Sequence, residues 1–269
     1  MPAKVEPKDP EYLSTLERGL SVLRAFNHEH PEMQLSEVAA AAGLSPAVAR
    51  RCLNTLVRLG YVAQHGRRFL LRPEVLEFGS AYLSSMNIER IVLPQLQALR
   101  DQTGDSSSLA VRSGQDVLYV AHVSTNRHIR LGAGVGTRFP WHAASLGKAI
   151  AAFQPDDVIA NLLDATSFQR FTERTITTAS DMLERLREVR TQGYAAAQDE
   201  LDYGIVSVSV PLFGAGRTAI AAINCSTSTT RVAQDELVRT RVPLLREAAQ
   251  ELEAALQRWP VLERSLTTM

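Results

Sequence analysis

One short cluster of residues in the sequence could support nucleophilic catalysis. Ser145 and Lys148 have the S-x-x-K spacing, which in penicillin-recognising enzymes places a serine hydroxyl beside an amine, and His142 lies close by. The S-D-N and K-T-G motifs that accompany this spacing in those enzymes do not occur in the chain. A ligand-binding enzyme or carrier is therefore kept only as the alternative interpretation.

Motifs for cofactors and metals are incomplete. The glycines of residues 132–137 lack the third position of a dinucleotide fingerprint, and residues 147–149 lack the earlier glycine and the hydroxyl of a phosphate-binding loop. The six histidines show no paired-ligand spacing, and Cys52 and Cys225 are far apart in the sequence. We therefore expect no cofactor and no metal ion.

The composition is typical of a protein inside the cell. No segment approaches the roughly 20 continuous apolar residues of a membrane-spanning helix. The first ten residues carry charges of both signs and have no apolar core, so they do not resemble a signal peptide. Two isolated cysteines fit a reducing compartment better than a disulfide framework. We expect a cytoplasmic protein with no membrane partner.

Charge is distributed unevenly along the chain, although the formal net charge is zero. Residues 1–73 contain ten Lys and Arg against seven Asp and Glu, and the stretch between Glu37 and Glu74 contains six arginines and no carboxylate. Such a stretch is typical of a surface that binds a polyanion such as nucleic acid. A solvated surface with a chance excess of arginine is the alternative.

Three helices are predicted within the first sixty residues. The first covers about 14–27, and the second is shorter and capped by Ser36. The third is capped by Ser45, has Pro46 at its first position, where a missing N–H costs nothing, and stops at Gly60. Two helices joined by a tight turn of this kind predict a helix-turn-helix.

The third helix has one apolar and one polar face. Its apolar side is predicted to consist of Ala49, Cys52, Leu53, Leu56 and Leu59. The candidate DNA-binding residues are Ser45, Ala47, Arg50, Arg51, Asn54 and Arg58. Arginine and asparagine pair well with guanine and adenine edges, and arginine also binds phosphates. A three-helix module that binds another protein is the alternative.

Residues 61–72 are predicted to form two short strands around a turn at His65-Gly66. Arg67 and Arg68 follow that turn. A basic hairpin beside a helix-turn-helix can lie along the phosphate backbone, where it adds salt-dependent affinity without sequence preference. The hairpin therefore completes a predicted winged helix-turn-helix.

The rest of the chain changes from a helical to a mixed pattern. Residues 73–104 are predicted to be helical, with a break around 85–94. Strands are predicted near 108–111, 117–124, 130–131, 194–198, 205–212 and 219–226, and helices near 145–153, 156–164, 180–192 and 233–257. Strands, then helices, then strands indicate an α+β domain with helices on the faces of an antiparallel sheet.

The chain resembles the IclR family of transcription regulators. The resemblance is carried by residues 14–26, 35–44 and 51–62, and by Gly136, Arg138, Pro140, His142, Ala143, Gly147 and Lys148. Residues 49–51 and 75–85 look closest to the branch that regulates protocatechuate, 4-hydroxybenzoate and β-ketoadipate catabolism. Val48 stands where many members have threonine, so no half-site sequence is carried over.

The resemblance implies three regions in this chain. Residues 1–73 would form the winged helix-turn-helix domain, residues 74–104 a helical linker, and residues 105–269 a GAF-like effector-binding domain. The implied protein is a homodimer, or a dimer of dimers, that binds a palindromic double-stranded DNA operator. A small organic acid, aromatic or dicarboxylic, would modulate this binding and so control catabolic genes.

The resemblance also places the effector pocket. Its candidate residues are Ser145, Leu146, Ser207, Asn224 and Ser226. Hydroxyls, an amide and free backbone N–H groups at the start of a helix suit a carboxylate. Ala197 stands where some members have an acidic residue, and this loss fits an anionic or aromatic ligand. Ordinary backbone capping is the alternative role of each serine and asparagine.

Overall fold

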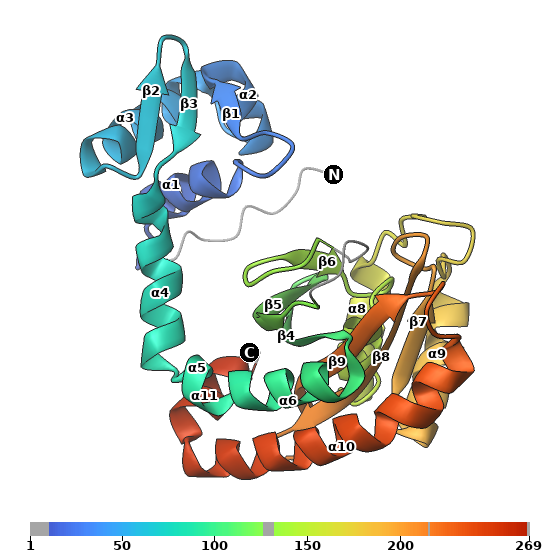
Figure 1. Ribbon diagram of the computed structural model, residues 1–269. Helices are drawn as coiled ribbons and strands as arrows, with labels where there is room; N and C mark the ends of the chain where they lie inside the picture. The colour runs from blue at the N-terminus through green and yellow to red at the C-terminus, as the bar shows by residue number, and fades with distance from the viewer. Residues whose placement is uncertain (1–10, 126–131, 215, 268–269) are drawn as a thin grey trace. The chain divides into compact units, whose positions relative to one another are not determined.

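The chain is organised into two compact units, Met1–Tyr82 and Leu83–Met269, and each has its own core. The computed structural model describes residues 11–125, 132–214 and 216–267 (Figure 1). The boundary between the units falls within helix α4 (Leu76–Ser85). Within these described ranges, no helix combines the length and the apolar character needed to cross a membrane.

The N-terminal unit is a winged helix-turn-helix. Helices α1 (Ser14–Arg24), α2 (Leu35–Ala41) and α3 (Pro46–Leu59) pack beside strands β1 (Glu32–Gln34), β2 (Val62–His65) and β3 (Arg68–Leu71). The strands form an antiparallel sheet in the order β1-β3-β2. The core contains Val22, Phe26, Met33, Val38, Leu53 and Phe69. The predicted fold of this unit is confirmed, and β1 is an additional strand.

Helix capping follows the prediction for α3 but not for α2. Oγ of Ser45 accepts a hydrogen bond from the backbone N–H of Val48 at 3.4 Å. Gln34, and not Ser36, caps α2, because the Glu37 carboxylate accepts the Gln34 N–H at 2.6 Å while the Gln34 side chain accepts the Glu37 N–H. This reciprocal pair satisfies two free donors where a serine would satisfy one.

The end of α3 and the hairpin turn also differ from the prediction. Helical periodicity predicts Leu59 on the buried side of α3, but its side chain is 62% exposed, because the buried residues of the helix end at Leu56. The hairpin turn lies at Gly66-Arg67, one residue later than predicted. The backbone φ of Gly66 is +59°, a left-handed conformation that glycine adopts without strain.

Three helical segments connect the hairpin to the C-terminal sheet. After a short 3-10 turn (Pro73–Val75), α4 is followed by α5 (Ile88–Ile91) and α6 (Leu93–Thr103). The predicted break is present, and Pro94 lies in the first turn of α6, where no N–H is required.

The C-terminal unit contains a six-stranded antiparallel sheet in the order β6-β5-β4-β9-β8-β7. The strands are β4 (Ser106–Ser113), β5 (Asp116–Val123), β6 (Arg138–Pro140), β7 (Ala195–Gln198), β8 (Ile205–Phe213) and β9 (Ala219–Ser228). The strand predicted at 130–131 lies outside the described residues. The two central strands, β4 and β9, come from opposite ends of this unit's sequence.

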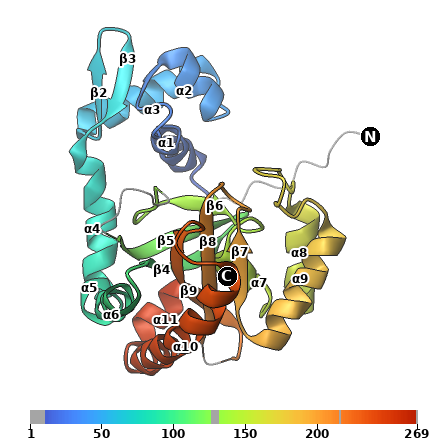
Figure 2. The same cartoon turned by 45° about the vertical axis from the view of Figure 1, so that its right-hand side comes forward.

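Helices cover both faces of this sheet, so the predicted α+β class is confirmed. Helix α7 (Ser145–Ala151) packs on one face with α8 (Asp156–Ala165) and α9 (Ala179–Gln192) beyond it. Helices α6 and α10 (Gln234–Arg258) run along the other face, and α11 (Pro260–Leu266) ends the chain (Figures 1 and 2). Buried Asp105, at the start of β4, pairs with Arg231 and Arg241 and fixes α10 to the sheet.

Candidate functional site

The outer face of α3 presents its polar side chains to solvent. Ser45, Ala47, Arg50, Arg51, Asn54 and Arg58 are all exposed. Within the part of the chain that the structure describes, the guanidinium groups of Arg50, Arg51 and Arg58 form no ion pair. Their N–H donors are therefore available to an external anion or to the edge of a base. A recognition helix needs such free donors on the face that enters the groove.

The hairpin arginines differ from one another in their partners. Arg67 lies in the exposed turn between β2 and β3. Arg68 donates to the backbone carbonyl of Glu32 at 3.3 Å and lies 3.9 Å from its carboxylate, which ties β3 to β1. Arg67 is therefore the freer of the two for contact with a phosphate, while Arg68 also has a structural role.

Two rows of small polar residues cross the middle of the C-terminal sheet. In the first row Ser106 (β4) stands opposite Ser226 (β9), which stands opposite Ser207 (β8). In the second row Ser108, Asn224 and Ser209 are opposite one another in the same way. Because side chains alternate along a strand, both rows point to the same face of the sheet.

Helix α7 begins directly over these rows. Oγ of Ser145 lies 2.9 Å from Oγ of Ser207 and 2.7 Å from Oγ of Ser209. Ser145 and Ser209 are buried, at 2% and 0% exposed, whereas Ser207 is half-buried. The first residue of α7 is thereby held on β8, and the hydroxyls can exchange donor and acceptor roles with a ligand.

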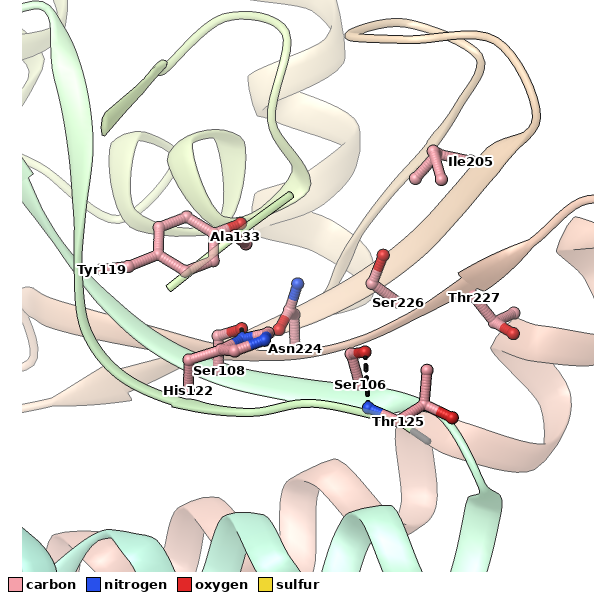
Figure 3. A pocket seen from close by; sticks show the side chains of 10 residues that line it. All are labelled: Ser106, Ser108, Tyr119, His122, Thr125, Ala133, Ile205, Asn224, Ser226 and Thr227. Atoms are coloured by element: carbon pink, nitrogen blue, oxygen red, sulfur yellow. Dashed lines mark hydrogen bonds between the residues drawn. The ribbon is translucent and has the colours of Figure 1, made fainter. Parts of the chain in front are cut away.

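Two adjoining pockets open beside the polar rows, and they share Tyr119, Ile205, Asn224 and Ser226. The α7 pocket, of about 30 Å³, is also lined by Ser145, Ser207, Ala197 and the 200–202 segment, which includes Glu200 and Asp202. The β4–β5 pocket, of about 20 Å³, is also lined by Ser106, Ser108, His122 and Thr125. Figure 3 shows Tyr119, Asn224 and Ser226 around the second pocket.

The structure brings four of the five predicted effector residues together. Ser145, Ser207, Asn224 and Ser226 line the α7 pocket. The side chain of Leu146 instead packs in the hydrophobic core, so only its backbone could face a ligand.

Sequence reasoning did not find Tyr119, His122, Ser106 and Ser108. The repeated Ser-x-Ser spacing on β4 and β8, matched by Asn-x-Ser on β9, was the signal that could have pointed to the serines.

The S-x-x-K residues are paired with other groups. Nζ of Lys148 lies 2.6 Å from Oε2 of Glu200, and Oγ of Ser145 bonds the β8 serines instead. The Arg185 guanidinium lies 3.8 Å from the other oxygen of Glu200. Burial lowers the pKa of Lys148, and the adjacent Glu200 carboxylate opposes that change. Lys148 therefore fixes the pocket wall at Glu200 and does not activate Ser145.

An aromatic cluster supports the start of α7. His142 is 3% exposed, contacts Phe168 and Phe171, and its Nε2 donates to the carbonyl of Gln169 at 3.0 Å. Burial lowers the pKa of His142, so the neutral ring is favoured. A Cβ on Gly147 would lie only 2.2 Å from the Trp141 carbonyl oxygen, so this motif glycine permits close packing.

Both units match one protein family. Residues 15–66 match the IclR helix-turn-helix domain, and residues 80–254 match the C-terminal domain of the bacterial transcriptional regulator IclR. The chain is 33% identical to the Pca regulon regulatory protein of Pseudomonas putida over 91% of its own length and 84% of that protein.

Solved structures agree with this match. A putative transcriptional regulator from Rhodococcus sp. RHA1 is 39% identical, with a TM-score of 0.78, over 92% of this chain and 99% of that chain. The inducer-binding domain of the PobR transcription factor from Acinetobacter, a double mutant in complex with 3-hydroxybenzoic acid, is 31% identical. It has a TM-score of 0.56 and covers 60% of this chain and 94% of that domain.

Proposed function

Because the chain belongs to the IclR family of transcription regulators, we propose that its C-terminal unit binds an aromatic carboxylic acid that changes how the N-terminal unit binds operator DNA. The protein is a DNA-binding transcription regulator and not an enzyme. The observation that carries the ligand proposal is the pair of Ser/Asn rows beneath Tyr119, in pockets that share the same central residues.

The pocket chemistry supports an aromatic acid. Tyr119 and Ile205 line both pockets and offer apolar surface to a ring, while serine hydroxyls and the Asn224 amide surround that surface with donors and acceptors. The Ser145–Ser207 pair at the start of α7 can donate to a carboxylate. The similarity to a PobR double-mutant domain solved in complex with 3-hydroxybenzoic acid favours the aromatic class over an aliphatic dicarboxylic acid.

The exposed face of α3 supports a role in reading DNA. In this proposal Arg50, Arg51 and Asn54 face base edges in the major groove, while Arg58 and the hairpin arginines contact phosphates. A protein with two such units reads a palindromic site whose half-sites are separated by about one helical turn or a multiple of it.

An exposed apolar hollow on the N-terminal unit supports the proposed homodimer. It is lined by side chains of α1, of α3 from Val48 to Leu59 (Arg51 among them) and of α4, including Leu16, Leu20, Leu59 and Phe78. Leu16 is 61% exposed, and Phe78 is 58% exposed although its ring contacts Tyr61, which is a large exposure for apolar side chains of this size. A second copy of this chain is the occupant we propose, and dimers could pair further into a dimer of dimers.

Each of the three regions of the chain has its own proposed role. We assign DNA binding to residues 1–73, connection to residues 74–104 and effector binding to residues 105–269. The regulator acts in the cytoplasm, where its operator is located, and controls genes for aromatic acid catabolism, in line with its Pca regulon relative.

The test is to incubate the full-length protein with sheared DNA of its own genome and to sequence what it retains. The retention is repeated with 3-hydroxybenzoate, with adipate and with no added acid. The proposal predicts one palindromic site whose retention changes with 3-hydroxybenzoate and not with adipate, since a ligand shifts only states that it binds unequally. Retention without sequence preference, or an equal response to both acids, would contradict it.

A further inference from the structure

The two pockets on the C-terminal sheet are compartments of one site, and both are small. Their volumes, about 20 and 30 Å³, are no larger than the roughly 30 Å³ that one water molecule occupies in the liquid. Pockets that hold organic ligands usually have volumes of about 300–1,000 Å³. An organic acid therefore enters this site only if part of the wall moves.

Most of the wall of the α7 pocket is held in the interior of the domain. Ser207, Asn224 and Ser226 lie on β8 and β9, which have a strand on either side, and every residue of α7 is buried. Among the described residues that line this pocket, Asp202 is the exposed one, and Leu201 beside it is half-buried. The segment 201–203, which we call the gate segment, is therefore the part of the wall best placed to move.

The gate segment leaves the sheet between two joined residues, Asp199 and Gly204. Oδ1 of Asp199 accepts the backbone N–H of Gly204 at 2.7 Å. The backbone φ is +56° at Asp199 and +79° at Gly204, so both residues have the left-handed conformation. Hinges are formed by a few residues at the ends of elements that absorb the change in φ and ψ. This neck can open without disturbing the pairing of β7 with β8.

The gate segment has few contacts of its own. Glu200, just before it, is anchored, because its carboxylate pairs with Lys148 and its carbonyl accepts Oγ1 of Thr175 at 2.7 Å. Within the described part of the chain, the gate segment reaches another element through one long hydrogen bond, 3.4 Å from the N–H of Glu173 to the Tyr203 hydroxyl. Segments with so few contacts open at a small cost in free energy.

The closed position also puts a negative charge against the pocket. The Asp202 carboxylate accepts the N–H of Tyr203 at 2.8 Å and has no ion pair among the described residues. The charge of Glu200, by contrast, is offset by Lys148 and Arg185. Like charges repel, and they do so more strongly where protein excludes water. An acid in this pocket is thus opposed by Asp202 until the gate segment is displaced.

We propose that residues 201–203 form a gate whose closed position and a bound organic acid exclude one another. The gate turns on Asp199 and Gly204, which breaks the hydrogen bond between them, enlarges the α7 pocket and withdraws the Asp202 carboxylate. The apparent association constant is then the intrinsic one multiplied by the fraction of open protein. This inference rests on the proposed binding of an aromatic acid.

Hydrogen–deuterium exchange of the full-length protein tests the gate directly, with and without saturating 3-hydroxybenzoate. A ligand that only filled a fixed pocket would slow the exchange of the surrounding amides. Here the amide of Gly204 should exchange faster when the acid is bound, because it loses Oδ1 of Asp199, while the amides of β8 and β9 should exchange no faster than before. Unchanged or slower exchange at Gly204 would overturn the inference.

Two variants of one hinge residue provide a matched comparison by calorimetry. Asp199→Ala removes the acceptor of the neck, so the closed position is weakened and 3-hydroxybenzoate should bind about fivefold or more tightly. Asp199→Asn keeps an Oδ1 acceptor, and asparagine tolerates the left-handed conformation, so its affinity should stay near that of the wild type. Equal affinity of the two folded variants would contradict the gate.

Asp202→Asn distinguishes a gate from a fixed wall. If Asp202 is withdrawn when the acid binds, the affinity for 3-hydroxybenzoate should change by less than about threefold. A fixed carboxylate facing the ligand would instead give about tenfold or more tighter binding of the acid in the variant, with no gain for the uncharged 3-hydroxybenzamide. That second result would overturn the inference.

These measurements separate the gate from the function on which it rests. If 3-hydroxybenzoate binds neither the wild type nor Asp199→Ala, the proposed effector class is wrong and the gate fails with it. If it binds the wild type and Asp199→Ala equally well, the function stands and only the gate is overturned.

Discussion

Nζ of Lys148 lies 2.6 Å from Oε2 of Glu200, and both side chains are buried. The pair joins α7 to the 200–202 segment that lines the α7 pocket. We expect Lys148→Met to destabilise the C-terminal unit by about 3 kcal/mol, since it leaves the Glu200 carboxylate buried with only Arg185 nearby.

Urea unfolding of the full-length protein measures this loss. The double variant Lys148→Met/Glu200→Leu should recover much of it, because the uncompensated carboxylate is then removed as well. A double variant as unstable as the single one would show that the effect comes from packing rather than from charge.

Gly147→Ala tests the close approach of α7 to Trp141. The new Cβ would lie 2.2 Å from a backbone oxygen, which cannot move aside as a flexible side chain can. We expect a loss of about 3 kcal/mol in unfolding free energy. Gly132→Ala is the control, because a Cβ added there would have no atom within 4 Å and the substitution should be neutral. Thermal unfolding followed by circular dichroism compares the two.

The buried His142 should make stability depend on pH. Burial lowers its pKa below the ordinary value of 6.5, so the unfolded chain binds a proton more readily than the folded one. Its contribution is therefore present above pH 6.5 and is lost as the pH falls below that value. Unfolding free energies at pH 7.5 and 5.5 should differ less in His142→Gln than in the wild type. An unchanged difference would assign the dependence to other groups.

Arg51 and Arg67 should affect DNA binding in different ways. Arg51→Ala should weaken binding to the retained site by about 1–3 kcal/mol and leave random DNA nearly unaffected if Arg51 reads a base. Arg67→Ala should weaken both equally and reduce the salt slope by about one. Fluorescence anisotropy at several salt concentrations measures both, with exposed Arg239→Ala on α10 as the control. Equal losses on both DNAs for Arg51→Ala would refute its base-reading role.

Leu20→Glu tests the apolar hollow as a contact between two copies. Leu20 is 44% exposed, so the charge should leave the fold of each copy intact. In a dimer the carboxylate would be buried without a partner, so analytical ultracentrifugation should show a shift toward monomer. Val135→Glu, at an apolar residue that is 53% exposed in the other unit, should leave the oligomer unchanged. A Leu20→Glu protein with wild-type assembly would exclude this surface.

Local sequence signals were sufficient to predict the winged helix-turn-helix and the α+β order of elements. Ser45, Pro46 and Gly60 define α3 because caps and turns depend on residues within a few positions of one another. The division of α3 into an apolar and a polar face follows from helical periodicity, which is also a local signal. The strand order β6-β5-β4-β9-β8-β7 could not be derived locally, because it depends on which distant segments pair.

The effector site shows the same division. The sequence, through its family resemblance, indicated Ser145, Ser207, Asn224 and Ser226, but it could not reveal Tyr119 or His122 as their neighbours. Only the pairing of β4 with β9 and of β9 with β8 aligns the serines into rows and places Asn224 between two compartments. The sequence alone therefore determined the helix and strand segments, their caps and the residues on each face. The long-range strand register, which decides which polar groups are buried together, was decided by the tertiary structure.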